Sequence, residues 1–438
     1  MRKILKSTGY LIAISLFTLF GCSKNEVSQV TDETITPSSP NILLIIADDM
    51  GKDATTGFSE GLLKPNTPNI NNFISSGITF SNCWVYPTCS PTRASIITGK
   101  YGYRTGVKWA NDQLNSSETI LQKYIKEQTN DSYSTAIIGK WHLSGNGINP
   151  LNPENFGMDH YAGLIGGGVQ SYYQWMLTNN QEVTTETEYI TEKFTDLSID
   201  WINTQDKPWF LWLAYTAPHT PFHVPPSEMH SQGNLPNYVD GMDALPYYLA
   251  AIEAMDYQIG RLLENIPKNE RENTVIIFIG DNGTPNQVAQ FPYSSTTVKG
   301  SLYQGGINTP LIVSGTGIDR FNVIDDNLIT STDLYATIAE LSGITIPNIN
   351  DSKSFKSLFS SVNSHRDFQY SEKDDGINDI WVLSDGQYKL FTDSNGNQEM
   401  YNLETDPYET NNILNGILNS SQQEIKETLE NELIQIRN

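Results

Sequence analysis

Residues 41–49 have the sequence NILLIIADD, a continuous apolar run that ends in two carboxylates. Such a run predicts a strand covered on both faces, as in the middle of a parallel sheet. Similar runs occur at 134–138, 209–214 and 274–279, and apolar residues at helical spacing fill 248–266. Because strands alternate with helices, we expect an α/β fold with a large mostly parallel central sheet and helices on both faces.

The sequence changes in character at about residue 366. Residues 381–391 alternate in the manner of a hairpin around Asp385-Gly386, and a polar helix is expected at 421–436. We therefore divide the folded chain into a main domain at 41–365 and a smaller C-terminal α+β subdomain with a short antiparallel sheet at 366–438.

The composition is typical of a folded protein with an acidic surface. The chain has 438 residues, 38% of them hydrophobic, and a formal net charge of −23. A surface of this charge repels nucleic acid and anionic membranes, so we expect no nucleic-acid partner. If the substrate is anionic, positive side chains must gather locally around the site.

The N-terminus has the pattern of an export signal. Basic residues precede an apolar run at 10–20, which is short for a membrane span. Residues 1–22 end in LFGC, which resembles a bacterial lipobox and would place a lipid on Cys22. Residues 23–40 then form a flexible tether, and the exported protein is lipid-anchored in the bacterial cell envelope. The alternatives are an uncleaved anchor or an ordinary signal peptide.

Two pairs of oxygen-bearing side chains follow predicted strands. Asp48 and Asp49 end the first apolar run, while Asp281 and Asn282 follow the run at 274–279. In an open α/β sheet, ligands bind at the carboxyl ends of the strands. Oxygen ligands without sulfur or imidazole suit Ca²⁺, suit Mg²⁺ less well, and argue against zinc. The alternative for Asp-Asn-Gly alone is a tight turn.

Four basic side chains occupy loops at equivalent places. Lys140 and His142 come directly after the run at 134–138, His219 follows the run at 209–214, and Lys299 precedes a glycine-rich segment. A lone Lys-x-His is usually a surface feature. Together, these four side chains predict a positive pocket beside the carboxylates, which would offset the acidic charge of the whole chain.

Residues 89–93 have the sequence CSPTR, and a small-residue segment ending in Thr98-Gly99 follows. By itself the pattern is weak, and its simplest alternative is a buried cysteine at the start of a helix. A second alternative is a Cys83–Cys89 disulfide, which is compatible with export. The disulfide would remove Cys89 as a nucleophile.

The motifs together, in this order, resemble the type I, formylglycine-dependent sulfatases of the alkaline phosphatase superfamily. The resemblance runs from about residue 41 to about residue 414. It rests on six motifs, which are Asp48-Asp49, Cys89-x-Pro91-x-Arg93, Gly139-Lys140-Trp141-His142, Pro218-His219, Asp281-Asn282-Gly283, and Lys299-Gly300 ahead of Gly305-Gly306.

The resemblance implies a role for each motif. The calcium ligands would be Asp48, Asp49, Asp281 and Asn282. A maturation enzyme would convert Cys89 to formylglycine, whose hydrated form attacks the sulfur of the ester. The remaining catalytic residues would be Arg93 and Lys140, which orient this group, His142, which takes its proton, and His219 and Lys299, which protonate the leaving alcohol.

One segment departs from the family pattern. The common Glu-Gly-Gly-x-Arg-x-Pro is here QGGINTP at residues 304–310, so neutral amides replace both charged side chains. If the charged residues normally pair, losing both leaves no buried charge without a partner.

The substrate is expected to be a sulfated oligosaccharide or polysaccharide, or an aryl sulfate. Aromatic residues that could stack on sugar rings, or simply pack in the core, are Trp109, Tyr161, Tyr172, Tyr173 and Trp175. Two rival functions remain. One is a formylglycine-dependent phosphonate monoester or phosphodiester hydrolase. The other is a non-catalytic glycan-binding lipoprotein in which Cys89 stays reduced or pairs with Cys83.

Overall fold

The computed structural model describes residues 39–438 except 148, 150–151 and 346–347. The predicted signal peptide, the lipidation site Cys22 and the tether up to residue 38 lie outside the described residues. Within the described part, residues 39–438 form one compact unit. No helix there is both long and apolar enough to cross a membrane.

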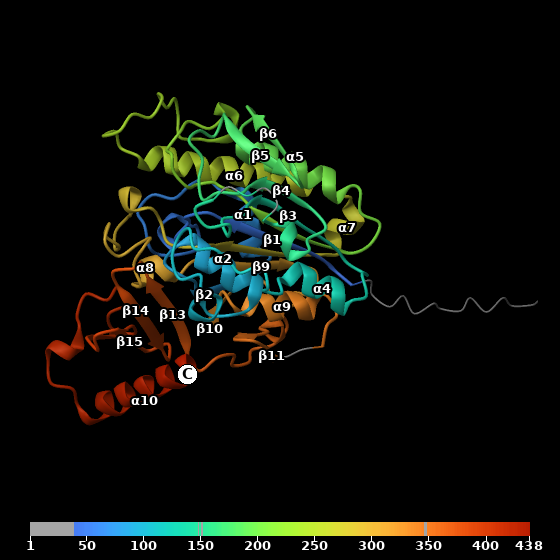
Figure 1. Ribbon diagram of the computed structural model, residues 1–438. Helices are drawn as coiled ribbons and strands as arrows, with labels where there is room; N and C mark the ends of the chain where they lie inside the picture. Colours follow the sequence, from blue (N-terminus) through green and yellow to red (C-terminus); the bar gives the residue numbers. More distant parts are fainter. Residues whose placement is uncertain (1–38, 148, 150–151, 346–347) are drawn as a thin grey trace, which may run out of the picture. The chain divides into compact units, whose positions relative to one another are not determined.

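A central sheet of ten strands dominates the described residues (Figure 1). Its spatial order is β10-β2-β9-β8-β1-β7-β3-β4-β5-β6. The strands are β1 Asn41–Ala47, β2 Gly77–Trp84, β3 Ser134–Lys140, β4 Tyr161–Leu164, β5 Trp175–Asn179, β6 Glu182–Glu186, β7 Trp209–Ala214, β8 Thr274–Gly280, β9 Leu311–Gly315 and β10 Val323–Thr330.

The middle of this sheet is parallel, as the apolar runs predicted. β1 pairs in parallel with β7 on one side and with β8 on the other, and β7 continues in parallel to β3. In this register Ala47 is opposite Gly280. The carboxyl ends of β1 and β8 therefore lie side by side. Antiparallel pairing occurs where β9 is inserted between β2 and β8, and at the edge formed by β4, β5 and β6, so the sheet is mixed.

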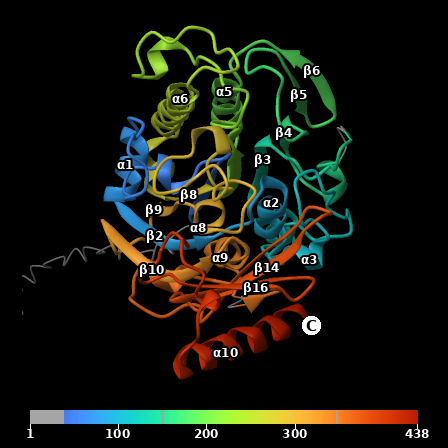
Figure 2. The same cartoon turned by 90° about the vertical axis from the view of Figure 1, so that its left-hand side faces the viewer.

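Helices cover both faces of the sheet, which confirms the predicted architecture (Figure 2). Alternate residues of the fully buried strand β1 enter two different apolar clusters. Ile42, Leu44 and Ile46 belong to the cluster that includes residues of three helices, α2 Cys89–Thr98, α4 Leu121–Gln128 and α9 Asp333–Leu341. Leu43, Ile45 and Ala47 belong to the cluster with α1 Pro68–Ser75, α5 Ile190–Ile202 and α6 Leu245–Asn265.

A second, four-stranded antiparallel sheet follows near the C-terminus. Its strands, in spatial order, are β13 Gln369–Asp374, β14 Asp379–Ser384, β15 Tyr388–Asp393 and β16 Gln398–Asn402. Ser384 pairs with Lys389, so the hairpin turns at Asp385-Gly386 as predicted. Helix α10, Ser420–Arg437, lies along this sheet (Figure 1) and buries Leu429 and Leu433 in the same apolar cluster as Leu383 and Leu390.

The remaining described elements are short. They are the helices α3 Gly102–Thr105, α7 Lys268–Glu272 and α8 Gln304–Ile307, the strand pair β11 Asn348–Ile349 and β12 Ser352–Lys353, and several single turns of 3-10 helix. Helix α8 lies within residues 304–310, the segment that departs from the family pattern and is called the departure segment below.

Candidate active site

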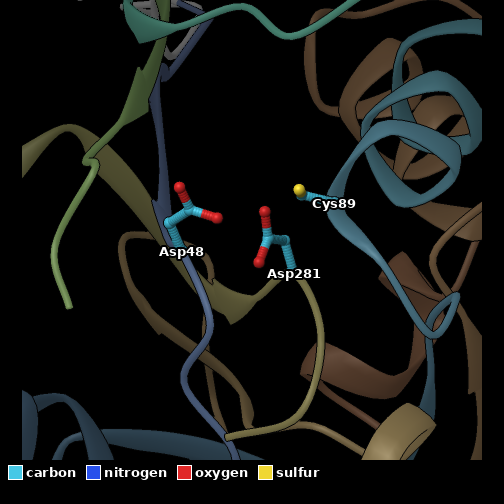
Figure 3. Close-up of side chains that lie close together, drawn as sticks. All are labelled: Asp48, Cys89 and Asp281. Atoms are coloured by element: carbon cyan, nitrogen blue, oxygen red, sulfur yellow. The ribbon is translucent and has the colours of Figure 1, made fainter. Parts of the chain in front are cut away.

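Acidic side chains from two neighbouring strand ends meet the first residue of helix α2. Asp48 follows β1, Asp281 follows β8, and Cys89 begins α2 (Figure 3). All three side chains are buried, and they point toward one another (Figure 3). One ligand atom from each lies within 4.8 Å of the other two. The structure therefore brings the predicted metal residues and the predicted nucleophile into one cluster.

Two oxygen atoms of this cluster have no hydrogen-bond partner among the described residues. They are Oδ1 of Asp48 and Oδ1 of Asn282, and both are buried. The Asn282 amide is oriented by its nitrogen, which donates to Asp49 Oδ1 at 2.7 Å and to the Gly283 carbonyl at 3.0 Å. A buried acceptor without a donor costs about 1–3 kcal/mol. A bound cation would satisfy both oxygens, so the residues present fit the predicted calcium.

Cations from helix α2, from the end of strand β3 and from the segment before α8 balance the three carboxylates. Lys140 Nζ lies 2.5 Å from Asp48 Oδ2, and Arg93 Nη2 lies 2.7 Å from Asp281 Oδ2. Lys299 Nζ lies 2.6 Å from Asp49 Oδ2. Lys140 and Arg93 are buried completely. Such pairs are tolerated in a protein interior only because each charge has a partner at hydrogen-bond distance.

The pKa values of the two neighbouring aspartates are driven apart. Burial alone raises the pKa of Asp49, but Lys299, His219 and Lys140 outweigh it and hold that pKa well below its usual value. Burial and the adjacent Asp48 raise the pKa of Asp281 to about 6, with Arg93 and Lys140 opposing the shift. A divalent cation bound between them would stabilise the ionised form of Asp281.

Cys89 is held against a histidine and a lysine. Its Sγ lies 3.2 Å from His142 Nδ1 and 3.6 Å from Lys140 Nζ. Burial nevertheless raises the pKa of the Cys89 thiol above its ordinary value, with Lys140 acting in the opposite direction. As an unmodified thiol, Cys89 is therefore a weak nucleophile at neutral pH.

The predicted alternative of a disulfide is not formed, since Cys83 and Cys89 are both free. Burial raises the pKa of the Cys83 thiol, which makes it unreactive. Cys83 lies in strand β2 and belongs to the apolar cluster on the α2 side of the sheet.

His142 is oriented by a residue that the motifs did not reveal. Its Nε2 lies 2.9 Å from Oδ1 of Asn111. An amide oxygen only accepts hydrogen bonds, so Nε2 carries the proton and the lone pair of Nδ1 faces Cys89. Burial, with Lys140 and Arg93 nearby, lowers the pKa of His142 well below its usual value. Asn111 has a positive φ of 67°, and an isolated loop asparagine in a sequence indicates only a turn.

A glycine packs directly on the same imidazole. A Cβ added to Gly167 would lie 2.2 Å from His142 Nε2, and one added to Gly168 would lie 3.4 Å from His219 Cε1. Any side chain at residue 167 would therefore displace His142. Gly167 therefore serves the close approach to the predicted catalytic His142, whereas a Cβ at Gly168 would make an ordinary contact with His219 and one at Gly166 would meet nothing within 4 Å.

His219 lies at the rim of the carboxylate cluster. Its Nδ1 is 2.7 Å from the carbonyl of Thr220 and therefore carries a proton, which turns Nε2 toward Asp49 Oδ2 at 3.7 Å. Burial lowers the pKa of His219 to about 4, although Asp49 raises it in part. The hydroxyl of Tyr172 donates to the carbonyl of His219 at 2.6 Å and so fixes the loop.

Of the five aromatic residues that were expected either to stack on sugar rings or to pack in the core, some are buried and others lie at the surface. Tyr161, Tyr172 and Trp175 are buried, so their role is packing. Tyr173 is 39% exposed, and Trp109 is half-buried with Lys373 Nζ 5.0 Å from its ring. Of the five, only Trp109 and Tyr173 expose part of the ring to solvent.

Neutral amides form a hydrogen-bonded pair in the departure segment. Asn308 Nδ2 donates to Gln304 Oε1 at 2.7 Å, and both side chains are buried. The backbone nitrogen of Gln304 donates to Glu409 Oε2 at 2.5 Å, while Glu409 Oε1 pairs with Lys389 at 2.6 Å. The substitution therefore keeps a side-chain contact between residues 304 and 308.

Comparisons with known proteins agree with this geometry. The Sulfatase family model matches residues 40–344, and the model of the C-terminal region of N-sulphoglucosamine sulphohydrolase matches residues 298–438. The chain is 29% identical to the uncharacterized sulfatase YdeN of Escherichia coli, over 72% of this chain and 64% of that protein. It is 26% identical to an arylsulfatase of Klebsiella aerogenes, over 70% of this chain and 87% of that protein.

A similar structure has been solved with an oligosaccharide. The crystal structure of Ps i-CgsB in complex with k-i-k-neocarrahexaose has a TM-score of 0.76 and 26% sequence identity, and covers 91% of this chain and 92% of that chain.

Proposed function

The chain belongs to the sulfatase family of sulfuric ester hydrolases, and we propose that it hydrolyses sulfate esters of oligosaccharides or polysaccharides through a formylglycine at residue 89. One observation carries the proposal. Cys89 Sγ, which marks the place of the formylglycine oxygens, lies among the carboxylates of Asp48 and Asp281 and 3.2 Å from a histidine nitrogen. A nucleophile, a base and a cation site are thereby brought together.

The side chains around residue 89 have distinct tasks in this proposal. The hydrated formylglycine supplies one hydroxyl to attack sulfur and a second to expel the sulfate afterwards. Lys140 and Arg93 stabilise negative charge on the attacking group and on the sulfate oxygens. His142 accepts a proton at Nδ1, because Asn111 keeps its proton on Nε2.

The leaving alcohol departs on the side of the cluster where Asp49 lies. His219 and Lys299 are both next to Asp49, and both reach the rim. When the sulfur–oxygen bond to the alcohol breaks, the alkoxide oxygen takes a proton from the Lys299 ammonium, or from Nε2 of His219 when that imidazole carries a second proton. The carboxylates of Asp48, Asp49 and Asp281, with the amide of Asn282, would hold Ca²⁺, which polarises the sulfate oxygens when bound.

Sulfated carbohydrate is the substrate class that we favour. A similar structure holds an oligosaccharide, and the partly exposed rings of Trp109 and Tyr173 are available to stack on sugar rings. We further propose that a maturation enzyme modifies Cys89. The protein would then be exported with its signal peptide and held by a lipid on Cys22 in the cell envelope.

The decisive experiment combines the mass of the peptide containing residue 89 with turnover of substrates. We expect a peptide with the mass of the aldehyde, and hydrolysis of an aryl sulfate at least about a hundredfold faster than of an aryl phosphodiester. Faster turnover of the phosphodiester would indicate the rival hydrolase. A free thiol in a protein that binds glycans without hydrolysing any sulfate ester would indicate the non-catalytic alternative.

A further inference from the structure

A cavity of about 830 Å³ lies outside the candidate active site. It is bounded by the loop after β1, by strand β2, by the departure segment at 304–308, and by the turns at 386–387 and 403–408. None of the ten predicted catalytic and metal-binding residues, all of which the structure describes, lines this cavity. Ligand sites in proteins commonly have volumes of about 300–1,000 Å³.

The wall of the cavity contains polar atoms without partners. Asn308 is 7% exposed, and its Nδ2 donates to Gln304 while its Oδ1 has no hydrogen-bond partner among the described residues. Oγ1 of Thr79, on strand β2, is also buried without a partner there. Such groups destabilise the protein unless a ligand or solvent pairs with them.

The buried side chain of Lys52 adds hydrogen-bond donors to the wall of the cavity. Lys52 is 4% exposed, and its Nζ donates to the carbonyl of Ser81 at 2.5 Å and lies 5.2 Å from the centre of the Phe58 ring. This single hydrogen bond uses one of its three N–H donors. Burial lowers the pKa of Lys52 to about 8, so the ammonium gains from any acceptor that enters.

The rest of the wall is aromatic and acidic. Tyr293 and Tyr408 pack edge to face with their ring centres 5.9 Å apart, and Phe58 also lines the cavity. Glu60 and Glu404 contribute carboxylates. Aromatic faces contact the C–H surface of a sugar ring, while amides and carboxylates bind its hydroxyls.

We propose that this cavity binds an uncharged, hydroxyl-rich stretch of a carbohydrate chain. A sugar hydroxyl both donates and accepts, so it can pair with the polar groups of this wall, among them the Lys52 ammonium and the carboxylates of Glu60 and Glu404. Glu60, Glu404 and the net charge of −23 disfavour a sulfated ring at this place. The cavity would hold the neutral parts of a polymer while its sulfate esters enter the active site. Any effect of this binding on turnover therefore rests on the proposed function.

Binding to neutral oligosaccharides tests this site. The full-length protein is titrated by calorimetry with unsulfated hexasaccharides of agarose, xylan, mannan and cellulose, and with a sulfated neocarrahexaose. We expect at least one neutral hexasaccharide to bind, and Tyr408→Ala to weaken that binding about tenfold through loss of a stacking face. The ratio of kcat/KM for a sulfated polysaccharide to that for a small aryl sulfate should fall by a similar factor.

The matched control is Tyr257→Ala. Tyr257 is a partly exposed tyrosine of α6 that does not line the cavity, and its removal should leave binding unchanged. Thermal unfolding confirms that Tyr408→Ala is folded. The inference is overturned if no neutral hexasaccharide binds, if Tyr408→Ala binds as the parent does, or if only the sulfated probe binds. Neutral binding at this cavity without sulfate ester hydrolysis would leave the site standing and remove the proposed function.

Discussion

Two buried ionic clusters in this protein have similar chemical components and opposite hydrogen-bonding states. At the cluster around Asp48 and Asp281, Oδ1 of Asp48 and Oδ1 of Asn282 accept no hydrogen bond from the described residues, although Arg93 Nη2 lies 3.7 Å from Asp48 Oδ1. At the second cluster, both carboxylate oxygens of Asp333 are used. They accept hydrogen bonds from the backbone nitrogens of Thr330 and Lys353, from His365, and from Arg366.

This difference indicates what each cluster is for. Burial raises the pKa of Asp333, but Arg366 and His365 overcome that effect and hold the pKa well below its usual value. Asp333 therefore joins helix α9 to the start of the C-terminal region as a complete structural pair. In the first cluster, buried oxygens that accept no hydrogen bond destabilise the folded protein, and this arrangement is expected of a ligand site.

Replacement of Cys89 by serine should give the largest effect of all. A serine could accept sulfate but has no second hydroxyl to expel it, so we expect multiple turnover of an aryl sulfate to fall at least about ten-thousandfold. Thermal stability should hardly change. The control is Cys83→Ser, at a buried free thiol outside the site. Rapid multiple turnover by Cys89→Ser would disprove the formylglycine mechanism.

Replacement of Asp333 by asparagine should lower the stability of the protein and leave its catalytic turnover largely unchanged. It leaves the largely buried Arg366 guanidinium without its counter-charge, and we expect a loss of about 3–5 kcal/mol in the free energy of unfolding, measured with urea. Aryl sulfate turnover by the folded fraction should persist. A loss of turnover without a loss of stability would contradict the division between the two clusters.

The same variant has a defined dependence on pH. Because the folded pKa of Asp333 is depressed, its contribution to stability is complete above the unfolded pKa of about 3.9 and is lost as pH falls below that value toward the folded pKa. The difference in unfolding free energy between the parent and Asp333→Asn should therefore narrow below about pH 4. A difference that stays constant across this range would contradict the assignment.

Stabilisation by Ca²⁺ should also distinguish the two clusters, although the expected change in unfolding free energy is smaller than that of Asp333→Asn. At a Ca²⁺ concentration a hundredfold above its Kd, we expect about 2.7 kcal/mol of stabilisation of the parent protein, followed as a rise in Tm. Asp333→Asn should show the same increment, whereas Asn282→Leu should show almost none. An equal increment in Asn282→Leu would place the calcium elsewhere.

The sequence was sufficient to predict the centre of the fold and the grouping of the main motifs. The run at 41–47 and the run at 274–279 became neighbouring strands, so Asp48 and Asp281 meet because their strands end at the same edge. The antiparallel insertion of β9 was not predictable, since an apolar run carries no information about strand direction. The catalytic and metal-binding roles remain predictions.

Contacts between loops were the part of the site that could not be predicted from the sequence. Asn111 contacts His142 only because the loop after α3 folds back over the site, and no spacing in the sequence encodes that contact. His365 received no role from the sequence, because its partner Asp333 lies 32 residues earlier, at the start of helix α9. Gly167 could be recognised as a flexible residue, but the histidine that excludes its side chain could not.

Every residue of helix α2 is buried, beginning with Cys89. An enzyme that carried out the proposed modification of Cys89 would reach this thiol in an unfolded chain, because in the folded protein Cys89 and the nine helix residues after it are buried. The proposed oxidation of this thiol would therefore precede the completion of folding and compete with it. The fraction of active molecules would then be set by two rates during biosynthesis, and faster-folding variants would yield more inert protein.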